Sequence, residues 1–358
     1  MKKIGLLTFH FPINYGAVLQ TYGLYTYLKK KGFDITLIDY YSDEHASRYH
    51  FYHQPKSIKN LFYYIIKTSF LSDYISKKKK FNEFRNKHFK LTRRYKSISE
   101  ILFNWDIILT GSDQVFNINH SDRIPYFQPF KKKANQIKAA YAPSFGINNL
   151  NDEIKEKISN LVKDFDFISC RESLGAHFLS QITGMKVEHV LDPVFLLDAK
   201  EWSSIASERL VKEKYLFVYD LNGKKPLIDI AKKLSADHKI VVLSNDPIAS
   251  LRKGYRGVDV FIKSASIEDF ISLIKYADAV ITDSFHGTVL SIIFEKPFYS
   301  YIALETASSR IIDILTILSM ENRLIKNIEG LSKIGNFHKP QKLKELITAS
   351  EKFLHQLT

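Results

Sequence analysis

Acid, hydroxyl and imidazole side chains that suit proton transfer are concentrated in one stretch, Asp283-Ser284-Phe285-His286-Gly287. Residues 279–281 before it are apolar and predict a short buried strand, and the apolar residues 289–294 after it predict a helix. A turn from a strand into a helix often binds anions, because backbone N–H groups and the helix dipole point at the ligand. The catalytic candidates in this turn are Asp283 and His286, and the substrate-binding candidates are Ser284 and Gly287.

A structural interpretation of this turn is equally consistent with the spacing. Asp283 or Ser284 would then cap the helix, because short polar side chains accept hydrogen bonds from first-turn N–H groups. His286 would be an ordinary first-turn residue whose hydrogen bonds are satisfied within the protein. Spacing alone does not decide between the two interpretations, and both stay open.

Other predicted strands also end in small or polar residues. Residues 3–9, 105–110, 138–141 and 165–169 are largely apolar and predict strands. Ligands of open parallel sheets bind along the carboxyl ends of the strands, where small residues let a ligand approach the backbone. The candidate binding residues after these strands are Asn14, Gly16, Ser112, Asp113, Ser144, Gly146 and Arg171.

Predicted strands and helices alternate along most of the chain, which indicates parallel sheets. A polar helical stretch at residues 198–214 separates two such series and predicts two domains, residues 1–198 and residues 199–358. The second domain ends in a predicted helix at Leu343–Leu357. We expect an α/β fold with two Rossmann-like domains facing across a cleft, so that the loops of both sheets converge. The GxGxxG fingerprint is missing from the first turn, which disfavours NAD or FAD.

The net charge of +14 is concentrated in one segment. Residues 56–96 contain 13 Lys and Arg residues and only two acidic residues. Apolar and basic residues are mixed as in amphipathic helices, so we predict a basic helical insertion at about residues 43–100 of the first domain, with a solvated run at Lys77–Lys80. Contact with an anionic membrane surface and a solvated face of an ordinary insertion both stay open. No signature of an RNA- or DNA-binding module accompanies the charge, so no nucleic-acid partner is expected.

The composition favours a two-domain globular protein of the cytoplasm. A chain of 358 residues exceeds one compact core, and no apolar run approaches the ~20 residues that span a bilayer. The single cysteine, Cys170, excludes an intramolecular disulfide and suits a reducing compartment. Asp164-Phe165-Asp166 is similar to a metal-binding DxD pattern, but it lies where a strand begins. We interpret it as structural and expect no metal.

Five motifs together resemble the polysaccharide pyruvyltransferase family. They are Asn14-Tyr15-Gly16-Ala17, GSDQVF at Gly111–Phe116, APSFG at Ala142–Gly146, RES at Arg171–Ser173 and DSFHG at Asp283–Gly287. The motifs follow the family's order over most of the chain. The resemblance implies a fold like that of the two-domain GT-B glycosyltransferases, without a catalytic metal. It also implies transfer of the pyruvyl group of phosphoenolpyruvate onto a sugar as a cyclic ketal, with no cofactor beyond this donor substrate.

The resemblance implies roles for individual residues. Arg171 matches the family's ligand-binding arginine, and His286 matches the histidine that the family uses. Phosphoenolpyruvate carries a carboxylate and a phosphate, and a planar guanidinium binds such groups in bidentate fashion. Some members have an arginine where this chain has Ser284, so another cation is expected to take its place. Arg310 is the leading candidate and Lys296 a weaker one.

The sequence is consistent with three hypotheses about function. The leading hypothesis is a pyruvyltransferase that acts on a cell-surface glycan precursor, such as a capsule or exopolysaccharide unit on a polyprenyl carrier. It places the protein in the cytoplasm, peripheral to the inner face of the cell membrane. A GT-B glycosyltransferase that uses a nucleotide sugar would share the fold but leave Arg171 and the DSFHG turn unexplained as a set. A non-catalytic carbohydrate-binding protein of the same fold is the third hypothesis.

Overall fold

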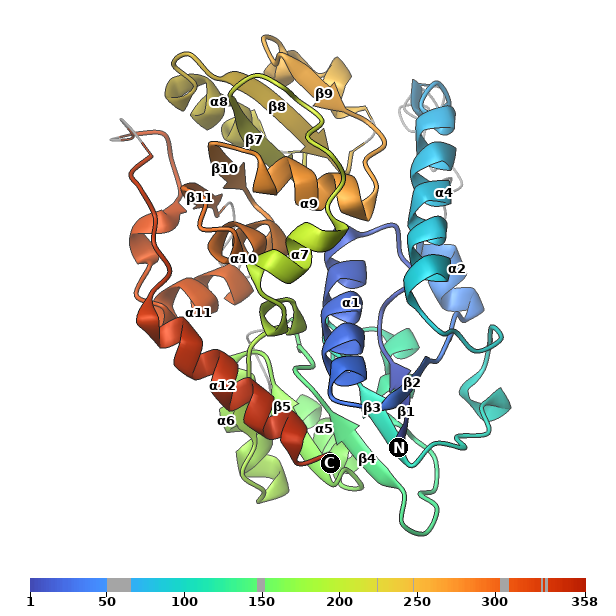
Figure 1. Cartoon of the computed structure of the whole chain (residues 1–358). Helices are drawn as coiled ribbons and strands as arrows, with labels where there is room; N and C mark the ends of the chain where they lie inside the picture. The colour runs from blue at the N-terminus through green and yellow to red at the C-terminus, as the bar shows by residue number, and fades with distance from the viewer. Residues whose placement is uncertain are drawn as a thin grey trace. The chain divides into compact units, whose positions relative to one another are not determined.

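The computed structural model describes residues 1–49, 66–146, 152–223, 225–246, 248–302, 309–329, 331 and 334–358. The chain forms two compact units. Unit 1 comprises Met1–Tyr49, Arg85–Leu197 and Gln341–Thr358, and unit 2 comprises His50–Phe84 and Asp198–Pro340. Figure 1 labels most of the helices and strands of both units.

Unit 1 is built on a six-stranded parallel sheet with strand order β2-β1-β3-β4-β5-β6. Its strands are β1 (Lys3–Leu7), β2 (Asp34–Leu37), β3 (Ile107–Thr110), β4 (Ile137–Ala140), β5 (Phe167–Cys170) and β6 (Glu188–His189). Its helices are α1 (Tyr15–Lys30), α2 (Asp43–Tyr49), α5 (Asp152–Val162), α6 (Ser173–Thr183) and α12 (Gln341–His355). Strand β2 lies on one side of β1, and strands β3 to β6 lie in order on its other side. The carboxyl ends of β1 and β3 therefore form a topological switch point.

Unit 2 is built on a second six-stranded parallel sheet, with strand order β12-β11-β10-β7-β8-β9. Its strands are β7 (Tyr215–Asp220), β8 (Lys239–Ser244), β9 (Val260–Ile262), β10 (Ala279–Thr282), β11 (Phe298–Tyr301) and β12 (Leu324–Ile325). Its helices are α7 (Ala199–Ile205), α8 (Lys225–Leu234), α9 (Ile267–Lys275), α10 (Phe285–Ile293) and α11 (Ser309–Ile317). The strand order reverses between β7 and β10, so their carboxyl ends form the switch point of this unit.

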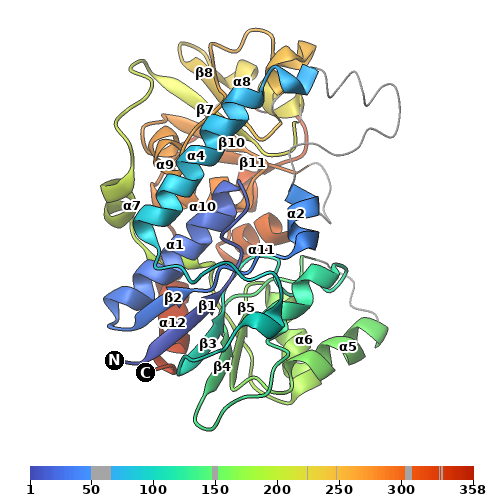
Figure 2. The ribbon, with the colours of Figure 1, turned by 90° about the vertical axis from the view of Figure 1, so that its right-hand side faces the viewer.

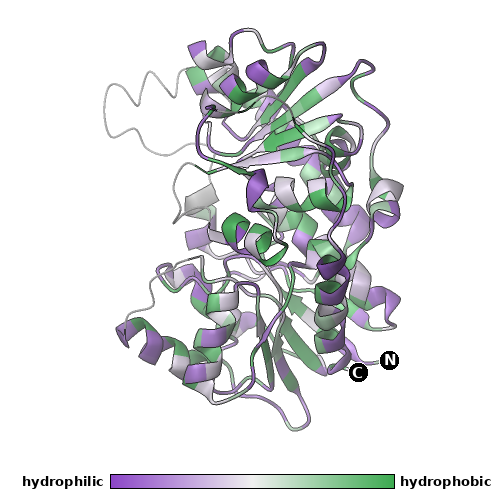
Figure 3. Cartoon of the chain, turned by 90° about the vertical axis from the view of Figure 1, so that its left-hand side faces the viewer, coloured by the Kyte–Doolittle hydropathy of each residue, from purple (hydrophilic) through white to green (hydrophobic). Residues whose placement is uncertain are grey.

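The strands form where apolar residues can be buried on both faces of a sheet. Every residue of β3, β7 and β10 is buried. Figure 3 shows the strands of both sheets as largely hydrophobic, and each unit has its own apolar core. Short 3-10 helices complete the elements: Ile98–Glu100, Ser121–Phe127, Pro193–Leu196, Ala249–Leu251, Lys253–Tyr255 and Glu321–Arg323.

These two sheets confirm the predicted α/β fold with two Rossmann-like units. The predicted assignment of the C-terminal helix to the second domain is wrong, because α12 belongs to unit 1. The Ser350 hydroxyl on α12 accepts a hydrogen bond from the Leu191 N–H at 2.9 Å, and the Phe353 ring lies 6.0 Å from the Tyr141 ring. The helix thus returns to bury its apolar face in the unit where the chain begins. A cleft between the units stays a prediction.

The basic insertion is divided between the two units. Its residues 50–65 lie outside the described residues. Figure 2 shows the following helix, α4 (Leu71–His88), as one continuous helix. It belongs to unit 2 as far as Phe84 and to unit 1 from Arg85 onward. Among the helices formed by described residues, none combines the length and apolar composition that a bilayer crossing requires.

The expected solvated lysine run on α4 is wrong for two of its four members. Lys77 is buried and donates to the Asn245 side-chain oxygen at 3.3 Å. Lys80 pairs with Asp269 at 3.3 Å. Lys77 and Lys80 are three residues apart and share the helix face that packs on unit 2. Lys78 and Lys79 are exposed, as expected.

Candidate functional site

The two switch points gather most of the residues that the sequence singles out. In unit 1, Asn14 and Gly16 follow β1, while Ser112 and Asp113 follow β3. In unit 2, Asp283–Gly287 follow β10, beside the loop that follows β7. Ligands of open α/β sheets bind at switch points, because the two connections diverge there and leave a crevice. We call the carboxyl ends of the strands around each switch point the ligand edge of that unit.

In unit 2, Ser284 caps helix α10. Its backbone is extended, and its hydroxyl accepts a hydrogen bond from the Gly287 N–H at 3.4 Å. Gly287 packs tightly on β10, since a Cβ there would meet the Thr282 hydroxyl at 2.7 Å. The structural interpretation therefore holds for Ser284 as the helix cap. Gly287 allows the helix to start directly against the end of the strand.

His286 lies in the first turn of α10 and is buried. The edge of its ring faces Phe285, with 5.1 Å between the ring centroids. The Arg310 guanidinium on α11 lies 5.9 Å from the same Phe285 ring. The predicted histidine and the predicted replacement cation therefore both lie near the ring of one aromatic residue, within unit 2.

Asp283 is engaged at both carboxylate oxygens. One oxygen accepts the backbone N–H of Leu221 at 2.7 Å, and the other accepts the side-chain N–H of Asn222 at 2.7 Å. Burial raises the pKa of Asp283, and the nearby Asp220 carboxylate adds to this effect. Asp283 thus fastens the end of β10 to the loop that follows β7.

That loop, Asp220-Leu221-Asn222-Gly223, was not among the residues predicted for the site. Asp220 is fully buried and accepts a hydrogen bond from the Tyr255 hydroxyl. Gly223 has a φ of +68°, in the left-handed region that favours glycine. A polar turn directly after the predicted strand at residues 215–219 was the available signal, of the same kind that singles out the other strand ends.

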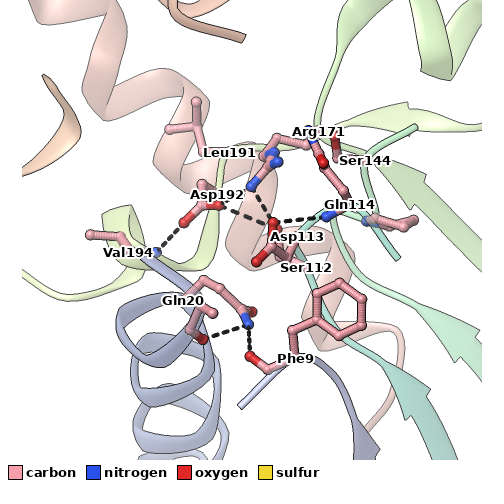
Figure 4. Close-up of polar contacts among 12 residues, drawn as sticks. Phe9, Gln20, Ser112, Asp113, Gln114, Ser144, Arg171, Leu191, Asp192 and Val194 are labelled. Carbon is pink, nitrogen blue, oxygen red and sulfur yellow. Dashed lines mark hydrogen bonds and ion pairs between the residues drawn. The ribbon is translucent and has the colours of Figure 1, made fainter. Parts of the chain in front are cut away.

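In unit 1, Arg171 is a buried partner of Asp192 (Figure 4). Its Nη1 lies 2.6 Å from a carboxylate oxygen of Asp192, which also accepts the Ser112 hydroxyl at 3.2 Å. The other Asp192 oxygen accepts the Val194 N–H at 3.0 Å. Burial alone would lower the pKa of Arg171, but the Asp192, Glu172 and Asp113 carboxylates outweigh it and raise the pKa. Sequence reasoning missed Asp192 as the residue that orients Arg171.

The loops after β3 and β4 are joined at this edge. The Ser144 N–H donates to the Asp113 carbonyl at 2.8 Å, and the Ser144 hydroxyl donates to the Glu172 carboxylate. Gly146 has a φ of +62°, in the left-handed region that favours glycine, and a Cβ there would meet the Gln114 amide nitrogen at 2.6 Å. Asp113, Ser144 and Gly146 therefore lie together at this edge.

Asn14 and Gly16 open helix α1. The Asn14 side chain caps the helix by accepting the Ala17 N–H at 3.2 Å. The preceding loop is fixed by Arg85, a residue not predicted for the site. Arg85 is buried and donates to three consecutive carbonyls, of His10 at 2.7 Å, Phe11 at 2.7 Å and Pro12 at 2.8 Å. The end of α4 thereby holds the approach to α1 in place.

The two edges differ in their cations. Unit 2 offers Arg310, which is half-buried, whereas Arg171 of unit 1 is buried against Asp192. Among the described residues, no group of three or more His, Cys, Asp or Glu side chains is arranged to hold a metal ion. Asp166 of the DxD pattern instead accepts the Lys138 N–H at 2.9 Å, a structural contact.

Two Rossmann-like units, each with polar residues at its ligand edge, define a two-domain α/β protein. The chain belongs to the polysaccharide pyruvyl transferase family, whose model matches residues 14–304, and the protein is therefore placed among transferases. No curated protein matches the sequence.

Several solved structures are similar in fold. A UDP-GlcNAc 2-epimerase from Neisseria meningitidis, bound to UDP-GlcNAc, is 12% identical, with 99% of this chain and 100% of that chain covered and a TM-score of 0.47. The E. coli ADP-heptose LPS heptosyltransferase II is 11% identical over 100% of both chains, with a TM-score of 0.40. Arabidopsis thaliana UGT89C1 is 10% identical over 99% of this chain and 94% of that chain, with a TM-score of 0.47.

Proposed function

We propose that this protein transfers the pyruvyl group of phosphoenolpyruvate onto two hydroxyl groups of a sugar, as a cyclic ketal, within a cell-surface glycan precursor. Membership of the polysaccharide pyruvyl transferase family supports the reaction class. The observation that carries the proposal is the arrangement at the ligand edge of unit 2, where His286 and Arg310 both lie near the Phe285 ring. A candidate proton-transfer group and a cation thus share one aromatic neighbour in unit 2.

The first step of the proposed reaction is a proton transfer, so the site must contain a proton donor. Protonation of C3 of the enol leaves an oxocarbenium-like centre at C2, which a sugar hydroxyl attacks as it loses its proton. The C2–O bond to phosphate then breaks, inorganic phosphate leaves, and a second hydroxyl attacks C2 to close the ketal. Histidine suits both proton steps near neutral pH, so His286 is proposed to carry them.

The donor carries two anionic groups that need cations or backbone N–H groups. Arg310 is proposed to bind one of them, in place of the arginine that some family members have at the position of Ser284. The start of α10 adds backbone N–H groups and the favourable end of the helix dipole. Arg171, in unit 1, is proposed to bind an anionic group of the substrate. The ion pair with Asp192 orients its guanidinium.

Binding of the donor can be tested before the acceptor is known. Phosphoenolpyruvate should raise the melting temperature of the purified protein, because a ligand that binds only the folded state stabilises it. Incubation with phosphoenolpyruvate and a panel of lipid-linked sugars should then release inorganic phosphate and add one pyruvyl group to an acceptor. Stabilisation by UDP with no response to phosphoenolpyruvate would instead favour a glycosyltransferase. A protein that responds to neither would contradict the proposal.

A further inference from the structure

The loop after β7 is fixed from both sides at the ligand edge of unit 2. On the β10 side, Asp283 accepts the Leu221 N–H and the Asn222 side-chain N–H, each at 2.7 Å. On the β8 side, Arg252 donates to the Gly223 carbonyl at 3.1 Å and pairs with Asp246. The loop is therefore held in one conformation at the switch point, although it lies at the surface.

The contact with Asp283 also fixes which way the Asn222 amide faces. A carboxylate only accepts hydrogen bonds, so the group that approaches it must be the amide nitrogen. The amide oxygen then lies on the opposite side of the same planar group. Asn222 is exposed, so this oxygen is within reach of a ligand. This amide oxygen can accept a hydroxyl hydrogen, but it offers no donor to a phosphate oxygen.

We propose that Asn222 binds a hydroxyl group of the sugar acceptor, and that Asp283 is a positioning residue for Asn222 rather than a proton-transfer residue. This inference rests on the proposed function, since it names the acceptor of the same reaction. It assigns a substrate contact to a loop that lies outside the five sequence motifs. It also leaves His286 as the one residue proposed to transfer protons.

Three variants of the full-length protein separate these roles. Asp283→Asn removes the charge but keeps an oxygen that can accept the Leu221 N–H. Its own amide nitrogen then faces Asn222, whose amide must turn over, so the acceptor meets a donor instead of an oxygen. Asn222→Leu removes the contact directly. Asp278→Asn is the matched control, because the Asp278 carboxylate accepts the Tyr215 N–H at 3.1 Å between the same two strands, at the opposite end of the sheet.

Steady-state kinetics of phosphate release gives the first readout. For Asp283→Asn and Asn222→Leu, the KM for the acceptor should rise about tenfold or more, as expected when a buried or oriented hydrogen bond is lost. The KM for phosphoenolpyruvate and the pH profile of kcat should stay as in the wild type, and the control should match the wild type throughout. A loss of kcat of ~10²-fold or more with a missing limb of the pH profile in Asp283→Asn would overturn the inference, because that is the behaviour of a general acid or base.

Hydrogen exchange of the protein without ligands tests the positioning role independently of the reaction. In Asp283→Ala the Leu221 amide should exchange about tenfold faster than in the wild type, since one hydrogen bond is lost. The same amide should be unchanged in Asp278→Ala. Equal exchange at Leu221 in the wild type and Asp283→Ala would overturn the inference, whatever the donor substrate is. If exchange behaves as expected while phosphoenolpyruvate neither binds nor reacts, the proposed function fails and the positioning role stands.

Discussion

His286 is the residue on which the proposed proton transfer depends. Replacing it by Gln keeps a polar side chain of similar size but removes the imidazole that is proposed to transfer the proton. Turnover should fall by ~10²–10⁴-fold, with little change in melting temperature. His238→Gln is the control, because its ring lies before β8, at the other end of the strands, and contacts Asp237. Activity above about a tenth of the wild type in His286→Gln would assign the proton transfer to another residue.

Arg310 is proposed to supply the cation that Ser284 does not. Arg310→Ala should raise the KM for phosphoenolpyruvate by roughly tenfold to a hundredfold, because a charge-assisted hydrogen bond contributes about 1.5–3 kcal/mol. Arg310→Lys should restore only part of the affinity, since an ammonium cannot bind in bidentate fashion. Arg256→Ala, which removes an exposed charge from the same unit, should leave the KM unchanged. An unchanged KM in Arg310→Ala would remove this residue from the site.

For individual residues, the sequence predicts a site whose residues are consecutive, but it does not predict partners that are far apart along the chain. The turn at Asp283–Gly287 could be predicted because its strand, polar residues and helix are consecutive. The pairings of Asp192 with Arg171 and of Asn222 with Asp283 could not be predicted, because the partners are 21 and 61 residues apart. Which acid meets which donor is decided by strand order in the sheet, and a single sequence does not give that order.

Among the elements, α4 shows how a charge count can mislead. Residues 77–80 are four consecutive lysines. Residues three apart lie on the same face of a helix, so Lys77 and Lys80 face the protein while Lys78 and Lys79 face solvent. Burial lowers the pKa of Lys77 to about 8. The charged form is therefore disfavoured in the folded protein, and Lys77 costs stability below that pH.

Lys77→Met should consequently stabilise the protein at neutral pH. A pKa lowered to about 8 corresponds to a cost of about 3 kcal/mol at pH 7, and the lost hydrogen bond to Asn245 offsets about 1 kcal/mol. The wild type should gain stability as the pH rises from about 8 toward 10, whereas Lys77→Met should not. Chemical denaturation at several pH values measures both effects, with the exposed Lys78→Met as the control. A destabilised Lys77→Met with an unchanged pH dependence would contradict the burial argument.

The exposed lysines of the same helix suit a different role. Lys78 and Lys79 remain available to an anionic membrane surface, where each basic residue contributes about 1 kcal/mol. Wild-type protein should co-sediment with anionic but not with zwitterionic vesicles, and less so at high salt, because screening acts within ~8 Å. Replacing both lysines by Gln should reduce binding more than replacing the exposed Lys212 and Lys214. Equal binding of the two double variants would indicate that α4 has only a solvated face.

For the whole molecule, alternation of strands and helices was sufficient to predict two α/β units, because parallel sheets need a crossover between strands. It was not sufficient to assign α12, whose sequence is that of an ordinary amphipathic helix. The contact from Leu191 to Ser350 joins residues 159 positions apart, so nothing near α12 in the sequence indicates its unit. The predicted meeting of both ligand edges at one cleft likewise depends on contacts that no local pattern encodes.

The central claim is that the protein protonates C3 of phosphoenolpyruvate and moves the resulting pyruvyl group to a sugar. It is tested most directly by mass spectrometry of the acceptor after reaction in D₂O, with wild type and His286→Gln side by side. The account predicts a product heavier by one pyruvic acid less one water, with one deuterium in the new methyl group, and almost no product with His286→Gln. A product without deuterium, or equal product from both proteins, would contradict it.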